Sequence, residues 1–255
     1  MDISSRINQE ALRLWERTFE ETADVPLPLI YAPMKQGTLL FVGLNPSFSK
    51  KGFRFLQGPY SNLDPIKYFH WSNRAGFELE IAQGVSELAK KKHPFFKKFR
   101  CVADYCSIDR EPMIDWEHVD LFFYPETRAE KLKSNPLIYA KNGITAFGSE
   151  QLELSKKLIL ELAPKVIVVA NAFASGVFVH EFNAEFDKGS VHQKPGPDGR
   201  LLLKDLGETG HHVIRINNRA VPVFLASMFT GQRAMDSYSY QRLRWQIKKA
   251  LLQSA

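Results

Sequence analysis

A single asparagine, Asn45, follows the apolar stretch TLLFVGL and is itself followed by a proline. An amide side chain is not a strong base, but it can orient a water molecule by hydrogen bonding. Hydroxyl, cationic and aromatic residues come next: Ser47, Phe48, Ser49, Lys50, Lys51, Phe53, Arg54 and Phe55. Aromatic rings stack on bases and lysines neutralise phosphates, so this mixture suits a nucleic acid. The alternative is a turn role for Asn45 and a core role for the phenylalanines.

Two further segments carry polar or basic side chains. KKKHPFFKKFR, at residues 90–100, interleaves aromatic rings with cations. It is interpreted either as a solvated helix end and loop or as a contact with the DNA backbone. The other segment follows the apolar stretch VPVFLAS, and its residues are Ser227, Met228, Thr230, Gly231, Gln232 and Arg233.

The composition favours an anionic partner, with simple solubility as the alternative explanation of the charge. The chain of 255 residues has a net charge of +6 and is 44% hydrophobic, enough to bury a full core. Cys101 and Cys106 are too few for a disulfide framework or an iron-sulfur cluster, and we predict no cofactor and no metal site. The charged N-terminal segment lacks the apolar region of a signal peptide, and no stretch is long enough to span a membrane. We therefore expect a soluble, cytoplasmic protein.

Four short apolar stretches are typical of strands that are buried on both faces. They are residues 38–44, 119–124, 165–170 and 221–227. Helical patterns lie around them, at residues 5–22, 64–73, 75–91 and 148–164. Asp64 and Ser149 are the expected N-caps of the second and fourth helices, and Pro164 ends the fourth.

Strands that alternate with helices predict a three-layer α/β/α fold with a central four-stranded parallel sheet. Residues 186–219 interrupt the alternation and predict a small hairpin-rich insertion. We expect a single domain over residues 1–255. In such sheets ligands bind at the carboxyl ends of the strands, which points to the loops at 43–62, 124–131, 170–176 and 227–240.

The segment FVGLNPSFS, followed by Gly52, resembles the first motif of the uracil-DNA glycosylase superfamily. The mismatch-specific and single-strand-selective branches of that family carry Gly-x-Asn-Pro at the end of the first strand. LAPKVIVVANAFASGVF is similar to the third-strand region of the family, and VPVFLASMFTGQRAMDSY lies where its second motif is expected. The resemblance covers roughly residues 38–250 and implies a uracil-DNA glycosylase-like domain.

The resemblance also implies roles for individual residues. Asn45 matches the residue that positions the attacking water, while Phe48, Phe53 or Phe55 would stack on a base extruded from DNA. Met228 or Phe229 would wedge into the duplex. The implied base-binding residues are Gly43, Leu44, Pro46, Ser47, Phe48, Phe55 and Tyr124. The implied DNA-binding residues are Lys50, Lys51, Ser227, Met228, Thr230, Gly231, Gln232 and Arg233.

Two departures from the family pattern leave the released base open. The second motif usually begins with His-Pro-Ser or Asn-Pro-Ser, whereas residues 227–233 contain neither histidine nor proline. Many members read the base with an asparagine on the second strand, where this chain has Phe122, Phe123 and Tyr124. Glu126 and Asp236 are the acids available as a general base if Asn45 does not suffice.

Three functions follow from these patterns. The first is a DNA glycosylase acting in base excision repair on uracil or another damaged or modified base. The second is a non-catalytic nucleic-acid-binding protein, and the third is a domain that binds a small nucleotide or phosphate ester. For the first, we expect a monomer whose partner is single- or double-stranded DNA, without membrane association.

Overall fold

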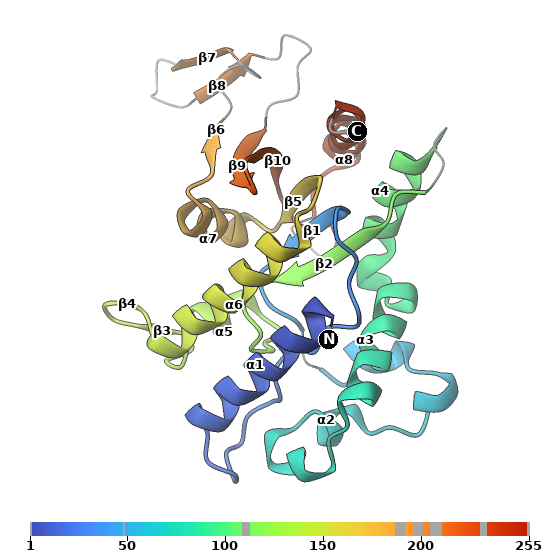
Figure 1. Ribbon diagram of the computed structural model, residues 1–255, viewed down its shortest axis with the longest axis vertical. Coiled ribbons are helices and arrows are strands. Elements are labelled where there is room, and N and C mark those ends of the chain that lie inside the picture. The colour runs from blue at the N-terminus through green and yellow to red at the C-terminus, as the bar shows by residue number, and fades with distance from the viewer. Residues whose placement is uncertain are drawn as a thin grey trace. The chain divides into compact units, whose positions relative to one another are not determined.

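The computed structural model describes residues 2–47, 49–108, 113–186, 192–195, 201–204, 211–229 and 234–253 (Figure 1). The chain divides into two compact units, which we describe separately. The first comprises Met1–Lys35, Gly43–Lys97 and Val119–Leu162, and the second comprises Gln36–Val42, Lys98–His118 and Ala163–Ala255. The single domain over residues 1–255 stays a prediction.

The main sheet has the strand order β2-β1-β5-β10-β9-β6 among the described residues. Strands β1 and β10 each pair in parallel with β5, whereas β9 is antiparallel to β10 and to β6. The four expected strands are therefore neighbours in a mostly parallel sheet, which two antiparallel strands extend. The bounds are β1 Leu39–Gly43, β2 Trp116–Asp120, β5 Val166–Ala170, β6 Glu185–Phe186, β9 His212–Ile216 and β10 Arg219–Ala226.

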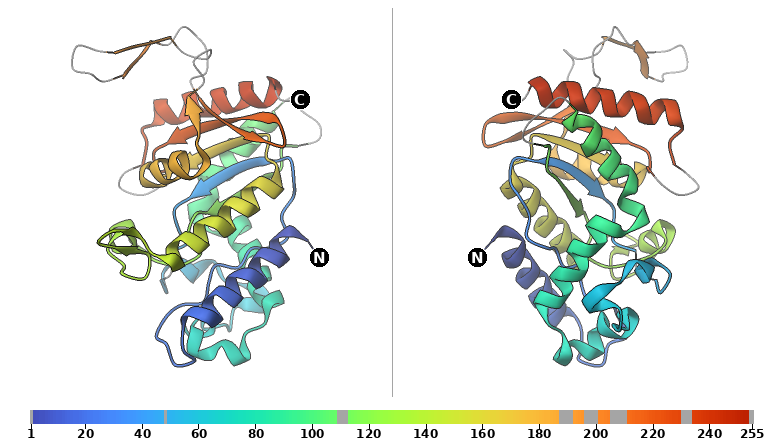
Figure 2. Two further views of the ribbon diagram at one scale, coloured as in Figure 1. Left: turned by 60° about the vertical axis from the view of Figure 1, so that its left-hand side comes forward. Right: turned by 90° about the vertical axis from the view of Figure 1, so that its right-hand side faces the viewer.

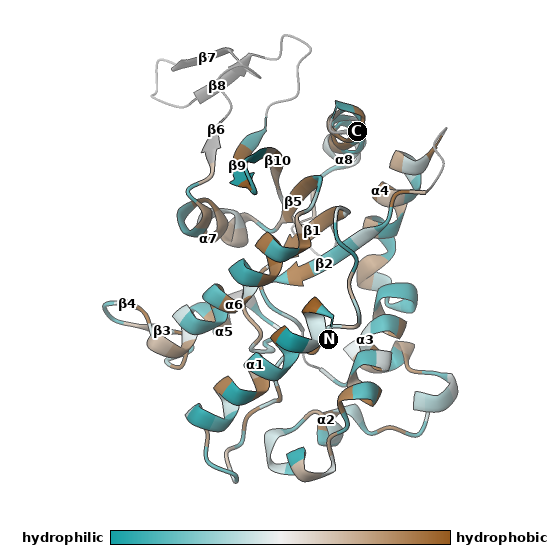
Figure 3. Cartoon of the chain, in the orientation of Figure 1, coloured by the Kyte–Doolittle hydropathy of each residue, from teal (hydrophilic) through white to brown (hydrophobic). Residues whose placement is uncertain are grey.

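Helices of the second unit flank this sheet. Figure 1 shows α7 (Ala172–Phe182) and α8 (Ser237–Gln253) on opposite sides of β5 and β10. Helix α4 (Lys97–Ser107) lies beside α8, where the Tyr240 hydroxyl donates to the Lys98 carbonyl at 2.7 Å. Every residue of β1 and β5 is buried, and Figure 3 shows both strands as apolar. Coverage of both faces explains these continuous apolar strands and is compatible with a three-layer α/β/α fold.

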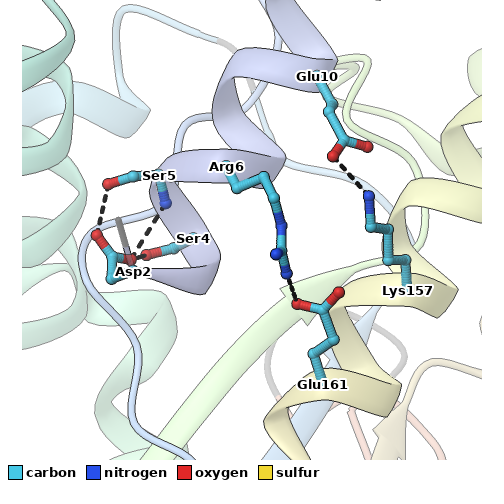
Figure 4. Close-up of polar contacts among 7 residues, drawn as sticks. All are labelled: Asp2, Ser4, Ser5, Arg6, Glu10, Lys157 and Glu161. Atoms are coloured by element: carbon cyan, nitrogen blue, oxygen red, sulfur yellow. Dashed lines mark hydrogen bonds and ion pairs between the residues drawn. The ribbon is translucent and has the colours of Figure 1, made fainter.

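Two long helices pack against each other in the first unit, α1 (Ile3–Thr18) and α6 (Ala146–Leu162) (Figure 2). The Asp2 side chain caps α1 by accepting from the Ser5 amide at 3.1 Å. Ion pairs link the two helices, between Arg6 and Glu161 and between Lys157 and Glu10 (Figure 4). The buried side chains of α1 recur every three or four residues and include Ile7, Ala11, Leu14 and Trp15.

Short elements fill the rest of the first unit. Helix α3 packs against two 3-10 turns, η1 and η4, and α2 packs against η3. The bounds are η1 Gly52–Phe55, η2 Gly58–Tyr60, α2 Pro65–Tyr68, η3 Trp71–Gly76, α3 Leu79–Lys92, η4 Pro94–Phe96, α5 Ala129–Lys133, β3 Tyr139–Ala140 and β4 Gly143–Ile144. Among the described residues, no helix combines the length and the apolar character needed to cross a membrane.

The second strand was predicted too late in the chain. The apolar stretch 119–124 was expected to form it, but β2 runs from Trp116 to Asp120. The polar residues Glu117 and His118 hide the start of the strand from a pattern of continuous apolar residues. Phe122 and Phe123 lie beyond the end of the strand. Their apolar character reflects their burial in the core and not membership of the strand.

Two helix predictions also need correction. The helix expected over 64–73 is only four residues of α2 followed by η3, although Asp64 caps α2 as predicted, accepting from the Lys67 amide at 3.4 Å. Helix α6 begins at Ala146, so Ser149 is inside it and is not its cap. The hydroxyl of Thr145 accepts from the Gly148 amide at 3.0 Å and takes that role.

The hairpins predicted within 186–219 are present. Strands β7 (His192–Pro195) and β8 (Leu201–Lys204) form one, and β9 forms the other with β10. Asn217 and Asn218 join the latter strands with φ of 50° and 63°, the left-handed values that a tight hairpin turn requires. This second hairpin is part of the main sheet and not separate from it, because β10 pairs with β5.

Candidate functional site

Asn45 lies two residues after the end of β1, at the carboxyl end of a parallel strand, as predicted. Its segment is joined by backbone hydrogen bonds to the segment that follows β2, and all these residues belong to the first unit. The bonds run from Leu121 N to Gly43 O (3.1 Å), from Phe122 N to Leu44 O (2.9 Å) and from Glu126 N to Pro46 O (2.9 Å). The loop that carries Asn45 is therefore held in place over its first four residues.

The side chain of Asn45 is half-buried, and within the described residues only its nitrogen forms hydrogen bonds. Nδ2 donates to the carbonyl of Glu126 at 2.6 Å and to the carbonyl of Pro46 at 3.2 Å. Both partners can only accept, so the amide must direct its nitrogen toward them. No donor among the described residues reaches Oδ1. Asn45 thus presents a fixed hydrogen-bond acceptor at the end of β1.

A buried carboxyl group, Asp120, ends the neighbouring strand β2. The Tyr31 hydroxyl accepts from the Asp120 amide at 3.0 Å and donates to the Asp120 carbonyl at 3.3 Å. The Asn8 side chain holds the Tyr31 backbone in turn, with bonds of 2.7 and 2.9 Å. Burial raises the pKa of Asp120 to about 8, and burial together with the Asp120 charge raises the pKa of Tyr31 well above its usual value.

Asp120 is not among the site residues predicted from the sequence. The signal was present in VDLFFY, where one carboxylate interrupts an apolar stretch. A charged residue inside a buried strand is uncommon and raises the prior for a functional group.

The aromatic residues after β2 belong mainly to the core of the first unit. Phe122 and Phe123 are fully buried. The Tyr124 amide donates to the Gln151 side chain at 2.8 Å, and the Tyr124 ring stacks on Trp15 with centroids 6.3 Å apart. Burial also raises the pKa of the Tyr124 hydroxyl. Packing therefore already uses one face of this ring, and a base-binding role for Tyr124 stays a prediction.

The polar loop after Asn45 makes a tight turn. The Gly52 amide donates to the Ser49 carbonyl at 2.8 Å, with the Ser49 hydroxyl at 3.1 Å. The turn exposes Lys50 and Lys51, and Ser47 is exposed before it. Phe48, one of the three candidate stacking residues, lies outside the described residues.

Phe55 does not stand alone on the surface. Its ring stacks on Phe53 at 6.2 Å and meets the edge of His93 at 5.1 Å. Phe53 also stacks on Phe69, with centroids 5.8 Å apart and planes inclined by 12°. Loop 43–62 therefore shares an aromatic cluster with the basic stretch near residue 93.

Part of the second predicted DNA-binding segment is described, within the second unit. Ser227 is exposed, whereas the Met228 carbonyl accepts from the Met235 amide at 2.9 Å. Phe229 is 1% exposed and packs against Phe41 and Phe99, which removes it as a wedge. Met228 as the wedge stays a prediction. Thr230, Gly231, Gln232 and Arg233 lie outside the described residues.

The two acids considered as general bases have structural partners. Asp236 caps α8 by accepting from the Tyr238 and Ser239 amides at 2.9 Å, and hydrogen bonds from Ser239 lower its pKa. The Glu126 carboxylate accepts from the Arg128 amide at 3.2 Å. Neither observation favours proton abstraction. Within the described ranges, no cluster of histidine, cysteine and acidic residues is suited to hold a metal ion.

Comparison with known proteins gives no independent assignment. The sequence matches no family model, and we found no curated protein that is similar to it. Any functional conclusion therefore rests on the residues themselves.

Proposed function

We propose that the protein is a DNA glycosylase with a uracil-DNA glycosylase-like fold, which hydrolyses the N-glycosidic bond of an extruded base. The observation that carries the proposal is the state of the Asn45 amide. Its nitrogen is engaged by two carbonyl groups, and its oxygen remains as an acceptor at the carboxyl end of β1. A group that orients water must be held rigidly and must present a hydrogen-bond acceptor to that water.

In the proposed reaction, a water molecule donates one hydrogen bond to Asn45 Oδ1 and directs a lone pair at C1′ of the deoxyribose. The water oxygen bonds to C1′ while the C1′–N bond breaks, and the bonding electron pair leaves with the base. The surplus proton of the water passes to the solvent, because an amide does not accept it. Asn45 acts by positioning and not as a base.

The fold supports this proposal through the position of Asn45. Ligands of parallel sheets bind beyond the carboxyl ends of the strands, and Asn45 follows a strand that lies between two others, β2 and β5. Asp120 ends the adjacent strand and adds a buried carboxyl group near the same edge.

The alternative is a nucleic-acid-binding protein without catalysis. It is favoured by the same two hydrogen bonds, since a link between the loops after β1 and β2 is sufficient reason for an asparagine at this position. On this alternative, DNA binds and no base is released.

A base-release screen tests the proposal. Single- and double-stranded DNA containing uracil, hypoxanthine, xanthine or a bulky modified pyrimidine is incubated with the protein, and free bases are detected by mass spectrometry. We expect release of at least one base. Binding of these DNAs with no base released from any of them would favour the alternative.

A further inference from the structure

Two segments that are about forty residues apart in the chain meet on the first unit. The ring of Phe55 in η1 contacts His93, the residue that precedes η4, with centroids 5.1 Å apart and planes at 80°. Helix α3, which ends at Lys92, also packs against both η1 and η4. The loop SKKGFRF and the basic stretch KKKHPFFK, both in the first unit, are therefore in contact.

Aromatic rings connect the two segments. Phe53, Phe55 and His93 are in sequential contact, and His93 continues to Phe95 at 6.4 Å. The His93 ring is fixed by its Nδ1, which accepts from the Phe95 amide at 3.0 Å. Phe95 is 36% exposed. An exposed ring on a fixed support is suited to stacking against a planar ligand.

Cations flank these rings in the sequence. Residues 49–57 and 87–97 contain seven lysines and arginines but only one acid, Glu87, which pairs with Lys91. Five of the cations are exposed and form no ion pair with any described residue: Lys50, Lys51, Arg54, Lys92 and Lys97. Their charge is available to an anionic ligand.

We propose that this aromatic–cationic surface, comprising Phe53, Phe55, His93, Phe95 and the five cations above, binds single-stranded DNA. The inference rests on the proposed function and names its substrate class. Unpaired bases offer their faces to aromatic side chains while the phosphates meet lysines, whereas the bases of a duplex are stacked on one another. A solvated helix end, the other interpretation of residues 90–100, does not require the contact between His93 and Phe55.

The test is binding of fluorescein-labelled oligothymidine, which contains no damaged base, measured by fluorescence anisotropy over a range of salt concentrations. The double variant Lys92→Glu/Lys97→Glu is compared with Lys131→Glu/Lys141→Glu, which makes the same charge change at exposed positions in α5 and beside β3. We expect the first variant to bind at least ten-fold more weakly and the control to bind like the wild type. The slope of log affinity against log salt should fall by about 1.4, or about 0.7 for each lost phosphate contact.

A second variant separates stacking from charge. Phe95→Ala should weaken binding about ten-fold, as expected for the loss of one base–aromatic stack, without changing the salt slope. Phe95→Leu keeps most of the apolar volume but lacks the ring, so it should also weaken binding about ten-fold. It replaces the alanine variant in this test if the alanine variant is unstable.

Three results would overturn the inference: equal binding by the wild type and both lysine variants, duplex bound as tightly as the single strand, or full competition by polyglutamate at equal charge. These outcomes are independent of catalysis. Strand binding without base release contradicts only the proposed function, and base release together with any of the three results above contradicts only this inference.

Discussion

Asn45 differs from an ordinary turn asparagine in the side-chain atom through which it forms hydrogen bonds. In a typical turn, the side-chain oxygen accepts from a backbone amide of the same chain segment. Here the nitrogen donates to the carbonyl groups of Pro46 and Glu126, the latter in the loop after β2. The bond to Glu126 joins two loops, and the side-chain oxygen of Asn45 takes no part in it. This hydrogen-bonding pattern is the physical basis for our proposal that Asn45 positions water.

Replacing Asn45 by aspartate tests this arrangement. A carboxylate cannot donate to either carbonyl, so at neutral pH Asn45→Asp should be less stable than Asn45→Ala by about 1–3 kcal/mol. Urea unfolding measures the difference, which should shrink at acid pH as the carboxyl group becomes protonated and regains a donor. Equal stability of the two variants at neutral pH would show that the nitrogen is not bonded as described.

Asp120 makes the stability of the protein depend on pH. Its pKa is about 8 in the folded state, above its unfolded value, so the folded state binds more protons between these two values. The stabilisation is present at low pH and is lost as the pH rises toward 8, by up to about 1.4 kcal/mol for each pH unit.

The variant Asp120→Asn removes this dependence. We expect the stability of the wild type relative to the variant to fall steadily between about pH 5 and pH 8, as measured by urea unfolding in a series of buffers. Parallel curves for the two proteins over that range would contradict a raised pKa.

At the scale of elements, continuous apolar stretches were reliable and interrupted ones were not. Strands β1 and β5 are buried on both faces and were predicted to within a residue of their bounds. Strand β2 was misplaced because Glu117 and His118 break its pattern, although Glu117 is buried. The helix over 64–73 failed because caps and prolines mark where a helix begins but not whether it continues. In these cases, tertiary contacts determine where the strand or helix begins and ends.

Close packing around Gly148 in helix α6 predicts how a substitution there changes stability. A β-carbon at this position would lie 2.7 Å from the Ile138 carbonyl oxygen and 2.7 Å from Ile144 Cγ1. A backbone oxygen moves only with its chain segment, so Gly148→Ala should destabilise the protein by about 1–3 kcal/mol. Thermal or urea unfolding measures this change.

Gly176 in α7 provides the matched control. Apart from its own chain neighbours and helix backbone, no heavy atom of the described residues would lie within 4 Å of a β-carbon there. Gly176→Ala should therefore stabilise the protein by about 0.5–1 kcal/mol, because alanine loses less backbone entropy in a helix. Equal effects of the two substitutions would contradict close packing of α6 against the β3–β4 hairpin.

At the scale of the whole molecule, alternation of apolar stretches and helical patterns was enough to predict a mostly parallel sheet and to place Asn45 at its carboxyl end. It did not predict that β6 and β9 extend the sheet, because a hairpin strand has the same local pattern whether or not it joins a larger sheet. Nor did it predict the contact between Phe55 and His93, since periodicity carries no information on which distant segments meet.

One rate comparison tests the proposed role of Asn45 most directly. On a DNA from which the wild type releases a base, the single-turnover rate of Asn45→Ala should fall on the order of a hundred-fold or more, the usual effect of removing one fixed polar group from an active site. Binding of the same DNA, measured by anisotropy, should not change. Base release by Asn45→Ala at the wild-type rate, with intact binding, would contradict the role given to Asn45.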